Sequence, residues 1–207
     1  MANMAHVIQG GWEAAQGALL AQMYQERKRV FIDLLRWDLP ALDGRYEIDQ
    51  FDTPSTIYLI IAGTDGKHLG SLRLLPTTQP HVLGDVFPGL CDLGAPSAPD
   101  VWEISRLCLS RSIRAAERRY VRNQLATALT VFARDNGVRA YCCVADMPWY
   151  NQILSFGWRC EPLGLPHDLP CGMLAALMIH IDDETPARLE ATGIWSETLA
   201  PLVALSQ

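Results

Sequence analysis

Charged and aromatic side chains in the first quarter of the chain are spaced so that they could form one binding site. Arg27 and Phe31 are four residues apart in a segment typical of a helix, so both side chains project from one face. Trp37 follows, and the acidic stretch after it contains Asp49 and Asp52. Arginine binds planar anions through two donors at once, whereas aromatic rings and carboxylates attract cations. Taken alone, an amphipathic helix with a surface arginine, a core phenylalanine and a structural tryptophan accounts for the same pattern.

A second group of charged side chains interrupts two segments typical of β-strands. Arg73 lies among leucines, and a buried guanidinium requires an anionic partner because an unpaired buried charge is costly. Glu103 and Arg106 follow in the segment WEISR, and an ideal strand would place them on opposite faces. A site that uses both therefore requires a bulge or a twist. An ion pair between Arg73 and Glu103 across neighbouring strands is the purely structural alternative.

These side chains need a scaffold, and hydrophobic periodicity indicates its elements. Strands are expected at 5–8 (an edge strand), 56–62, 68–75, 101–109, 138–144, 158–163 and 171–181, and helices at 12–35, 114–136 and 148–156. The second and third strands form a hairpin, and residues 76–99 form an ordered loop with short helical turns. Strands first, followed by alternating helices and strands, predict an α/β sandwich around a mixed sheet.

Composition excludes several classes of protein. The 207 residues are 49% hydrophobic and 19% charged, which excludes disorder, and they are expected to form one domain over residues 1–207. A net charge of −6 leaves the chain as a whole without affinity for nucleic acid. The six cysteines form no C-x-x-C pair and no histidines have metal-ligand spacing, so no metal site is expected. Without a targeting pattern or a membrane span, we expect a cytoplasmic protein with buried, reduced thiols.

Taken in order, these residues resemble the acyl-homoserine-lactone synthases, the autoinducer synthases of bacterial quorum sensing. The resemblance is close over residues 7–109 and looser to residue 181. It rests on an ordered series of motifs: Arg27-x3-Phe31-x5-Trp37, Glu47-x-Asp49-x2-Asp52, Gly70-Ser-x-Arg73-Leu-Leu-Pro-Thr-Thr78-x-Pro80, Leu83-Gly-Asp85-Val-Phe87 and Trp102-Glu103-x-Ser105-Arg106.

The resemblance implies a three-layer α/β/α sandwich with a mixed sheet, similar to that of the N-acyltransferases. It also implies two substrates, acyl-acyl carrier protein and S-adenosylmethionine, and no cofactor. The amine of S-adenosylmethionine attacks the acyl thioester, and its carboxylate then displaces methylthioadenosine to close the lactone. Glu103, Arg73 and Asp49 are the catalytic residues that the resemblance implies, with Glu103 or a water that it holds as the base.

The resemblance also implies the residues that bind S-adenosylmethionine. A sulfonium cation attached to adenosine requires aromatic faces and carboxylates, and its carboxylate requires arginine. The six residues in these roles are Arg27, Phe31, Trp37, Asp49, Asp52 and Arg106. Whether Arg73 instead holds Asp49 or Asp52 as an internal ion pair stays open.

A basic stretch follows the last motif. Six arginines and one acid lie between residues 106 and 122, a local charge of +5 that would steer an acidic carrier protein. The predicted carrier-protein patch is Arg111, Arg114, Arg118, Arg119 and Arg122. A solvated helix face is the structural alternative. The glycine-rich turn with which acetyltransferases hold coenzyme A is absent, which favours the carrier protein over acyl-coenzyme A.

The acyl chain is expected to lie in a pocket formed after the long helix. The predicted lining is Val144, Ala145, Met147, Trp149 and Ile153. Family members that take 3-oxo chains tend to have a threonine in this stretch, and this chain has none in Tyr141–Asp146. We therefore expect an acyl chain without a 3-oxo group.

Two other functions fit parts of the pattern. The first is another N-acyltransferase that uses acyl-coenzyme A, since the fold would be the same. The second is a non-catalytic module that binds a nucleoside or a carrier protein. Release of methylthioadenosine only in the presence of S-adenosylmethionine would exclude the first. Loss of turnover in Glu103→Gln or Arg73→Ala would exclude the second, since a pure binding module would keep nearly the same affinity.

Overall fold

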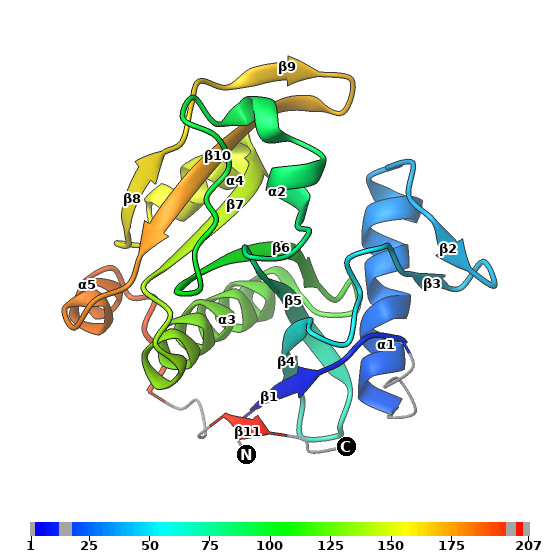
Figure 1. Cartoon of the computed structure of the whole chain (residues 1–207). Helices are drawn as coiled ribbons and strands as arrows, with labels where there is room; N and C mark the ends of the chain where they lie inside the picture. Colours follow the sequence, from blue (N-terminus) through cyan, green and yellow to red (C-terminus); the bar gives the residue numbers. More distant parts are fainter. Residues whose placement is uncertain (1–2, 13–17, 198–201, 205–207) are drawn as a thin grey trace. The chain divides into compact units, whose positions relative to one another are not determined.

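The computed structural model describes residues 3–12, 18–197 and 202–204, which divide into two compact units. The first unit comprises Met1–Arg73, Arg106–Ala128 and Ser196–Gln207, and the second comprises Leu74–Ser105 and Leu129–Trp195. The boundaries between the units fall within strands β5 (His68–Pro76) and β6 (Val101–Leu109), within helix α3 (Ala115–Asn136), and between Trp195 and Ser196; Figure 1 labels the three elements. The single domain over residues 1–207 stays a prediction.

The first unit contains a sheet that begins with β1 (Met4–Gln9). This strand pairs antiparallel with β4 (Ile57–Ala62) and parallel with β11 (Val203–Ala204), so the prediction that it is an edge strand is wrong. The amide of Gly63 donates to the carbonyl of Lys67 at 2.9 Å, which closes the predicted turn from β4 into β5. A separate small hairpin is formed by β2 (Ala41–Leu42) and β3 (Tyr46–Glu47).

The first helix differs from the continuous α-helix predicted over residues 12–35. It is α-helical only in α1 (Ala18–Arg27) and continues as a π-helix, η2 (Lys28–Leu34); residues 13–17 lie outside the described residues. The amide of Leu35 accordingly donates to the carbonyl of Val30 five residues back, at 2.9 Å. The apolar spacing of the sequence does not distinguish the two helix types, because a short π-helical segment shifts the apolar repeat only slightly.

Helix α1 packs on the sheet of the first unit through a small apolar core. This core consists of Ile8, Leu20, Met23, Tyr24, Tyr58 and Ile60. Strand β4 contributes the alternate residues Tyr58 and Ile60 and strand β1 contributes Ile8, as expected for a sheet with one face toward a helix. The packing places the C-terminal end of α1, and with it Arg27, beside the strand that carries Tyr58.

The second unit contains the rest of the mixed sheet. Strand β6 pairs parallel with β7 (Ala140–Asp146), which pairs antiparallel with β10 (Gly172–His180). Strand β10 also pairs with β8 (Arg159–Pro162) and β9 (His167–Leu169). Parallel and antiparallel pairs in one sheet confirm the predicted α/β class with a mixed sheet.

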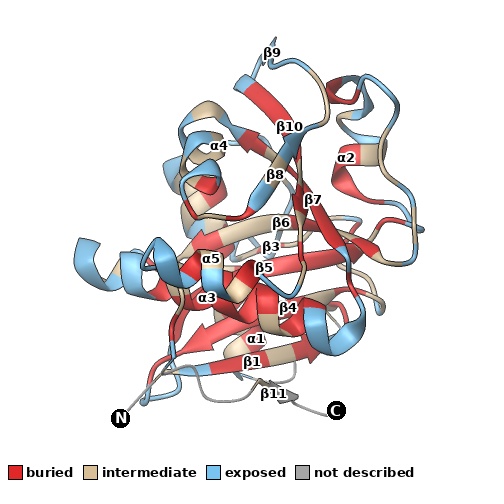
Figure 2. Cartoon of the chain, turned by 90° about the vertical axis from the view of Figure 1, so that its left-hand side faces the viewer, coloured by how far each residue is buried: buried red, intermediate tan, exposed pale blue. Residues whose placement is uncertain are grey.

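Helices cover both faces of this part of the sheet. Helix α2 (Val82–Asp85) and the short η3 (Pro88–Leu90) lie on one side of β7 and β10, and α4 (Met147–Leu154) lies on the other (Figures 1 and 2). The two short helices confirm that residues 76–99 form an ordered loop with helical turns. Strand β9 and helix α5 (Thr185–Ala191) were not predicted.

Four of the six cysteines are buried as predicted, while Cys160 is half-buried and Cys171 is exposed, which corrects the prediction for that residue. Burial raises the pKa of Cys108 to about 12, so this thiol stays protonated and unreactive at neutral pH. No helix among the described residues combines the length and apolarity needed to cross a membrane.

Candidate active site

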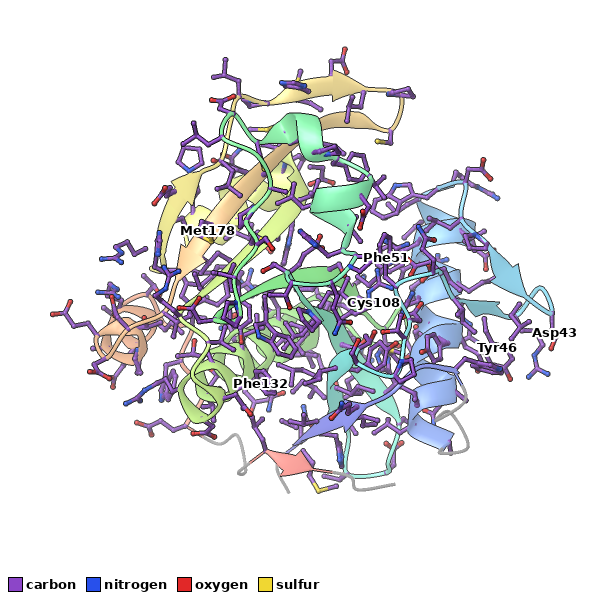
Figure 3. The ribbon with its side chains drawn as sticks, viewed as in Figure 1. Asp43, Tyr46, Phe51, Cys108, Phe132 and Met178 are labelled. Carbon is purple, nitrogen blue, oxygen red and sulfur yellow. The ribbon has the colours of Figure 1, made fainter. Side chains whose placement is uncertain are left out.

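The first unit holds three arginines and three carboxylates in one buried group, which we call the arginine–carboxylate cluster. Arg27 ends α1, Arg73 lies in β5 and Arg106 lies in β6. The carboxylates are Glu47 at the end of β3, with Asp49 and Asp52 in the loop that follows. Phe51, labelled in Figure 3, belongs to the same loop, and its ring lies 5.7 Å from the Arg73 guanidinium carbon.

Asp52 is the most heavily engaged carboxylate of the cluster. Arg27 binds it through two donors, Nη1 to Oδ1 at 2.8 Å and Nη2 to Oδ2 at 2.9 Å. Nη1 of Arg73 lies 3.0 Å from Oδ1, and the amide of Asp49 donates to Oδ2 at 2.9 Å. A fifth donor, the hydroxyl of Tyr58, lies 2.7 Å from Oδ1. Asp52 therefore joins two arginines that come from different elements.

Asp49 and Glu47 extend the cluster to the third arginine. Arg73 binds Asp49 with two donors, at 2.6 and 3.1 Å, and Nη2 of Arg106 binds Asp49 at 2.7 Å. Glu47 accepts from Nε of Arg27 at 2.5 Å and from Nε of Arg106 at 3.1 Å. Each carboxylate therefore bridges two arginines, and the three positive and three negative groups balance.

The side chains of the cluster differ in how far they are exposed to solvent. The side chains of Arg27, Arg73, Glu47 and Asp52 are at most 1% exposed, that of Asp49 is 5% exposed, and that of Arg106 is 10% exposed. Burial alone would raise the pKa of Asp52, but Arg27 and Arg73 hold it well below its usual range. Burial, followed by the positive charges of Arg73 and Arg27, lowers the pKa of Arg106. Arg106 is thus the arginine of the cluster that is nearest to solvent.

Two aromatic rings lie next to Arg106. Phe31, in η2, is 5.5 Å from its guanidinium carbon, and Trp37 stacks on Phe31 with ring centres 5.1 Å apart at 20°. The π-helix and the hydrogen bond from the Trp37 amide to the Phe31 carbonyl, 2.9 Å, bring these two rings together. Phe31 is buried, whereas Trp37 is 38% exposed, so the outer ring is available to a ligand.

The backbone of Arg106 has a left-handed conformation, with φ of +52°. Such a conformation costs about 1–2 kcal/mol in a residue with a side chain, and it interrupts the alternation of β6. The sequence indicated a bulge or a twist in this segment, and the positive φ of Arg106 is such a local departure from ideal strand geometry.

Glu103 lies in the second unit and is 1% exposed. Its Oε1 accepts a hydrogen bond from the amide of Leu83 at 3.1 Å, which ties it to α2. Glu103 is in register with Cys142 across the parallel pair β6–β7, so the two side chains share a face of the sheet. On that face lies the apolar cluster of the second unit, formed by Leu83, Leu90, Cys91, Cys142, Leu174 and Ala176.

The structure does not bring the five residues predicted to line the acyl pocket onto one face. Val144 packs against the apolar cluster, on the α2 side of β7. Ala145, its neighbour in the strand, faces the opposite side, because side chains alternate along a strand. Met147, Trp149 and Ile153 lie in α4, on the other side of the sheet from α2 (Figure 2). The sequence prediction ignored the alternation of β7.

The five arginines of the predicted carrier-protein patch all lie in the first unit, before and within the first half of α3. Arg111, Arg114 and Arg119 are exposed, while Arg118 and Arg122 are half-buried. Arg122 donates to the side-chain oxygen of its neighbour Asn123 at 2.8 and 3.1 Å. The patch is therefore a largely solvated group of positive charges.

Sequence reasoning gave no role to three buried residues of this site. Glu47 was part of a motif, but its position between Arg27 and Arg106 depends on the β2–β3 hairpin. Tyr24 and Tyr58, whose hydroxyls lie 2.8 Å apart, read as ordinary core residues of a helix and a strand. No local sequence pattern indicates that a buried tyrosine hydroxyl will bind a carboxylate of a nearby loop, as Tyr58 binds Asp52.

The described residues contain no group of three or more potential metal ligands of the His, Cys, Asp and Glu types. A hollow of about 310 Å³ in the first unit is lined by residues of α1, η2 and the β2–β3 turn, among them the ion pair of Lys28 and Asp33, and includes none of the predicted site residues. The arginine–carboxylate cluster and its aromatic rings remain the part of this unit that is suited to a charged ligand.

Comparisons with known proteins agree with the family resemblance of the sequence. A family model described as autoinducer synthase matches residues 13–189. The acyl-homoserine-lactone synthase of Ralstonia nicotianae is 34% identical over 192 residues, which are 90% of this chain and 93% of that protein.

Two solved structures are similar over most of the chain. The CoA-dependent acyl-homoserine lactone synthase BjaI, solved with SAM and isopentyl-CoA, has a TM-score of 0.83 and 28% identity, over 99% of this chain and 93% of that one. TofI, in a ternary complex with an inhibitor and MTA, has a TM-score of 0.77 and 30% identity, over 90% of this chain and 96% of that one. These neighbours confirm the N-acyltransferase-like α/β fold. Because the family model spans most of the sequence and the Ralstonia relative covers nearly all of it, the chain belongs to the autoinducer synthase family.

Proposed function

We propose that this chain is an acyl-homoserine-lactone synthase. It transfers an acyl chain from a thioester donor to the amine of S-adenosylmethionine and then releases methylthioadenosine as the lactone closes. The observation that carries the proposal is the arginine–carboxylate cluster with its exposed aromatic ring, in a chain that belongs to the autoinducer synthase family. S-adenosylmethionine is a substrate here, and no cofactor or metal is part of the proposal.

The first step forms an amide. The nitrogen lone pair of the amine attacks the thioester carbonyl carbon, the carbon–nitrogen bond forms, and the carbon–sulfur bond breaks to release a thiolate. The amine must first lose a proton, which Glu103 or a water that it holds accepts. As the amide forms, the nitrogen loses a second proton, which the departing thiolate takes up to leave as a thiol, so the step is balanced. The apolar surroundings of Glu103 keep bulk water away from this exchange.

The second step closes the ring. A carboxylate oxygen of the acylated substrate attacks the carbon next to the sulfonium, and the carbon–sulfur electron pair leaves with methylthioadenosine. No protein nucleophile and no proton transfer is needed, so the protein contributes mainly orientation. An arginine that holds the carboxylate near the sulfonium carbon supplies this orientation.

The geometry supports different roles for the predicted binding residues. Arg106, with 10% of its side chain exposed, is best placed to bind the substrate carboxylate, and Trp37 is best placed to lie against the sulfonium or the adenine. Arg27, Arg73 and Asp52 are saturated with internal partners and position Arg106 through Glu47 and Asp49. Phe31 supports both Arg106 and Trp37.

We place the acyl chain against the apolar cluster of the second unit, on the face that Glu103 shares. Val144 lies on this face and is the predicted pocket residue that lines the chain directly. Ala145, Met147, Trp149 and Ile153 then shape the pocket from behind the strand. Because Val144 offers no hydroxyl to a 3-oxo group, the proposal keeps an acyl chain without that oxygen.

The acyl donor is proposed to be acyl-acyl carrier protein. The exposed arginine patch before and within α3 is suited to the acidic surface of such a partner. The relative BjaI is described as CoA-dependent, so acyl-coenzyme A is the donor to compare. A cytoplasmic location is also part of this proposal.

The test is an assay of the purified protein with S-adenosylmethionine and either acyl donor. The proposal expects methylthioadenosine and an acyl-homoserine lactone in equal amounts, and only when both substrates are present. Acyl transfer to another amine without methylthioadenosine would identify a different N-acyltransferase. Binding of the nucleoside without any turnover would identify a binding module.

A further inference from the structure

Two buried tyrosines form a hydrogen-bonded chain that ends on the arginine–carboxylate cluster. Tyr24, in α1, and Tyr58, in β4, are both 0% exposed, and their hydroxyl oxygens lie 2.8 Å apart. The Tyr58 hydroxyl also lies 2.7 Å from Oδ1 of Asp52. The mechanism proposed above gives neither hydroxyl a role.

The direction of this chain follows from its acceptor. Asp52 is ionised, since Arg27 and Arg73 hold its pKa low against the effect of burial, so its oxygens only accept. Tyr58 must therefore donate its single proton to Asp52, and Tyr24 must donate to Tyr58. Burial, reinforced by the negative charge of Asp52, raises the pKa of both phenols, so both stay protonated at working pH. The chain is a fixed donor array directed at one carboxylate oxygen.

That oxygen is the atom on which two arginines meet. Oδ1 of Asp52 accepts from Arg27 at 2.8 Å and lies 3.0 Å from Nη1 of Arg73. Because three donors converge on Oδ1 and two on Oδ2, the carboxylate cannot rotate without losing several bonds. Tyr58 is the one donor of Oδ1 that comes from the apolar core and carries no charge, so it fixes the carboxylate plane without competing for other carboxylates.

From Asp52 the contacts lead to the ligand-facing arginine. Arg73 binds Asp52 and Asp49 together, and Asp49 binds Nη2 of Arg106 at 2.7 Å. A shift of the Asp52 carboxylate would therefore move Arg73, then Asp49, and finally the fork of Arg106. All these residues belong to the first unit.

We propose that Tyr58, itself oriented by Tyr24, is a positioning residue that sets the Arg106 fork for the carboxylate of S-adenosylmethionine. This inference rests on the proposed function, because it concerns the same site. A positioning role predicts that the two nucleosides respond differently to loss of the Tyr58 hydroxyl, whereas a purely structural role predicts the same response for both. Methylthioadenosine lacks the amino-acid end of S-adenosylmethionine, so its binding should not depend on how Arg106 is set.

The experiment is calorimetric titration of both nucleosides into the wild-type protein and Tyr58→Phe. Loss of one hydrogen bond to a charged group predicts about tenfold weaker binding of S-adenosylmethionine, and binding of methylthioadenosine changed less than about twofold. The matched control is Tyr141→Phe, which removes another fully buried phenol hydroxyl, one that donates to the Leu129 carbonyl in the second unit. This control should leave both affinities unchanged.

Tyr24→Phe serves as a second variant if Tyr58→Phe does not fold. It keeps the Tyr58–Asp52 bond and removes only the donor behind it, so a smaller loss, about threefold, is expected for S-adenosylmethionine alone. Equal weakening of both nucleosides, or none, in a folded variant overturns the inference while the proposed function stands. Failure of the wild-type protein to bind S-adenosylmethionine overturns the proposed function itself.

Discussion

The two units of the molecule differ in the surroundings of their buried charges. In the first unit, three arginines and three carboxylates neutralise one another through bonds of 2.5 to 3.1 Å, and almost none of them reaches solvent. In the second unit, Glu103 lies on a face of the sheet that is otherwise apolar and receives a backbone amide from α2. The first arrangement is suited to holding a zwitterionic, positively charged substrate in one orientation. The second is suited to moving a proton.

This difference predicts that substitutions in the two units fail in different ways. Breaking an ion pair in the first unit should cost stability and substrate affinity, since the remaining charge stays buried without its counter-charge. Neutralising Glu103 should cost turnover while leaving nucleoside binding in the first unit intact.

Glu103→Gln should give the largest effect on activity. Loss of a general base lowers kcat about 100- to 10,000-fold, and an amide cannot accept the proton of the amine. Release of methylthioadenosine measures this loss, and titration with S-adenosylmethionine should show affinity within about twofold of wild type. The control is Glu161→Gln, an exposed glutamate of β8. Retention of wild-type turnover by Glu103→Gln would remove Glu103 as the base.

Asp52→Asn should give the largest effect on stability. It leaves Arg27 and Arg73 short of a buried counter-charge, at a cost of about 3–5 kcal/mol in the free energy of unfolding. Asp43→Asn is the matched control, because Asp43 is exposed at the tip of the β2–β3 hairpin (Figure 3) and asparagine tolerates its positive φ.

The same pair of variants tests the acid sensitivity of the first unit. Asp52 has its pKa lowered in the folded state, so its contribution is complete above its unfolded pKa of about 3.9 and is lost as the pH falls below that value. Unfolding curves between pH 5 and pH 2 should therefore be steeper for wild type than for Asp52→Asn. Parallel curves would contradict the ion-pair account of the cluster.

Several element bounds and most charged residues of the cluster could be predicted from the sequence, because their signals are local. The alternation of Val101–Leu109 predicted β6 with its observed bounds, and Asn136-Gly137 marked the end of α3, where Gly137 has φ of +68°. The motifs named five of the six charged residues of the cluster in roles. A buried arginine requires an anionic partner, so arginines and aspartates within apolar segments indicate an ion-pair cluster even without a structure.

Other features depend on long-range register and could not be predicted. The Tyr58–Asp52 bond requires β4 to place one hydroxyl over a loop, and the stack of Phe31 on Trp37 requires the π-helical turn. The acyl pocket is a different case. Val144 and Ala145 are adjacent in a strand, so their divergence was readable from the alternation rule.

His68 offers a further test within the first unit. Burial lowers its pKa to about 4, so the folded protein holds it neutral while the unfolded chain protonates it near 6.5. Its contribution is therefore lost as the pH falls from about 6.5 to 4, by up to about 3 kcal/mol. His68→Gln should flatten the dependence of unfolding free energy on pH in this window, while the exposed control His167→Gln should not. The same dependence of unfolding free energy on pH in both variants would contradict this role of His68.

The arginine patch should show the smallest effect, because its charges are solvated. The double variant Arg114→Glu, Arg119→Glu should raise KM for acyl-acyl carrier protein about tenfold at low salt, and less at high salt. KM for S-adenosylmethionine should not change, since the patch and the buried cluster use their arginines differently. An unchanged KM for the carrier protein would leave the patch as an ordinary solvated helix face.

We propose that the buried cluster of the first unit, with its outer aromatic ring, binds S-adenosylmethionine. The most direct test of this binding is a calorimetric titration of that nucleoside into the wild-type protein and Trp37→Ala, whose side chain is exposed enough to be removed without disturbing the core. We expect one site per chain in the wild type and about tenfold weaker binding in the variant. Absence of binding in the wild type, or equal affinity in both proteins, would contradict it.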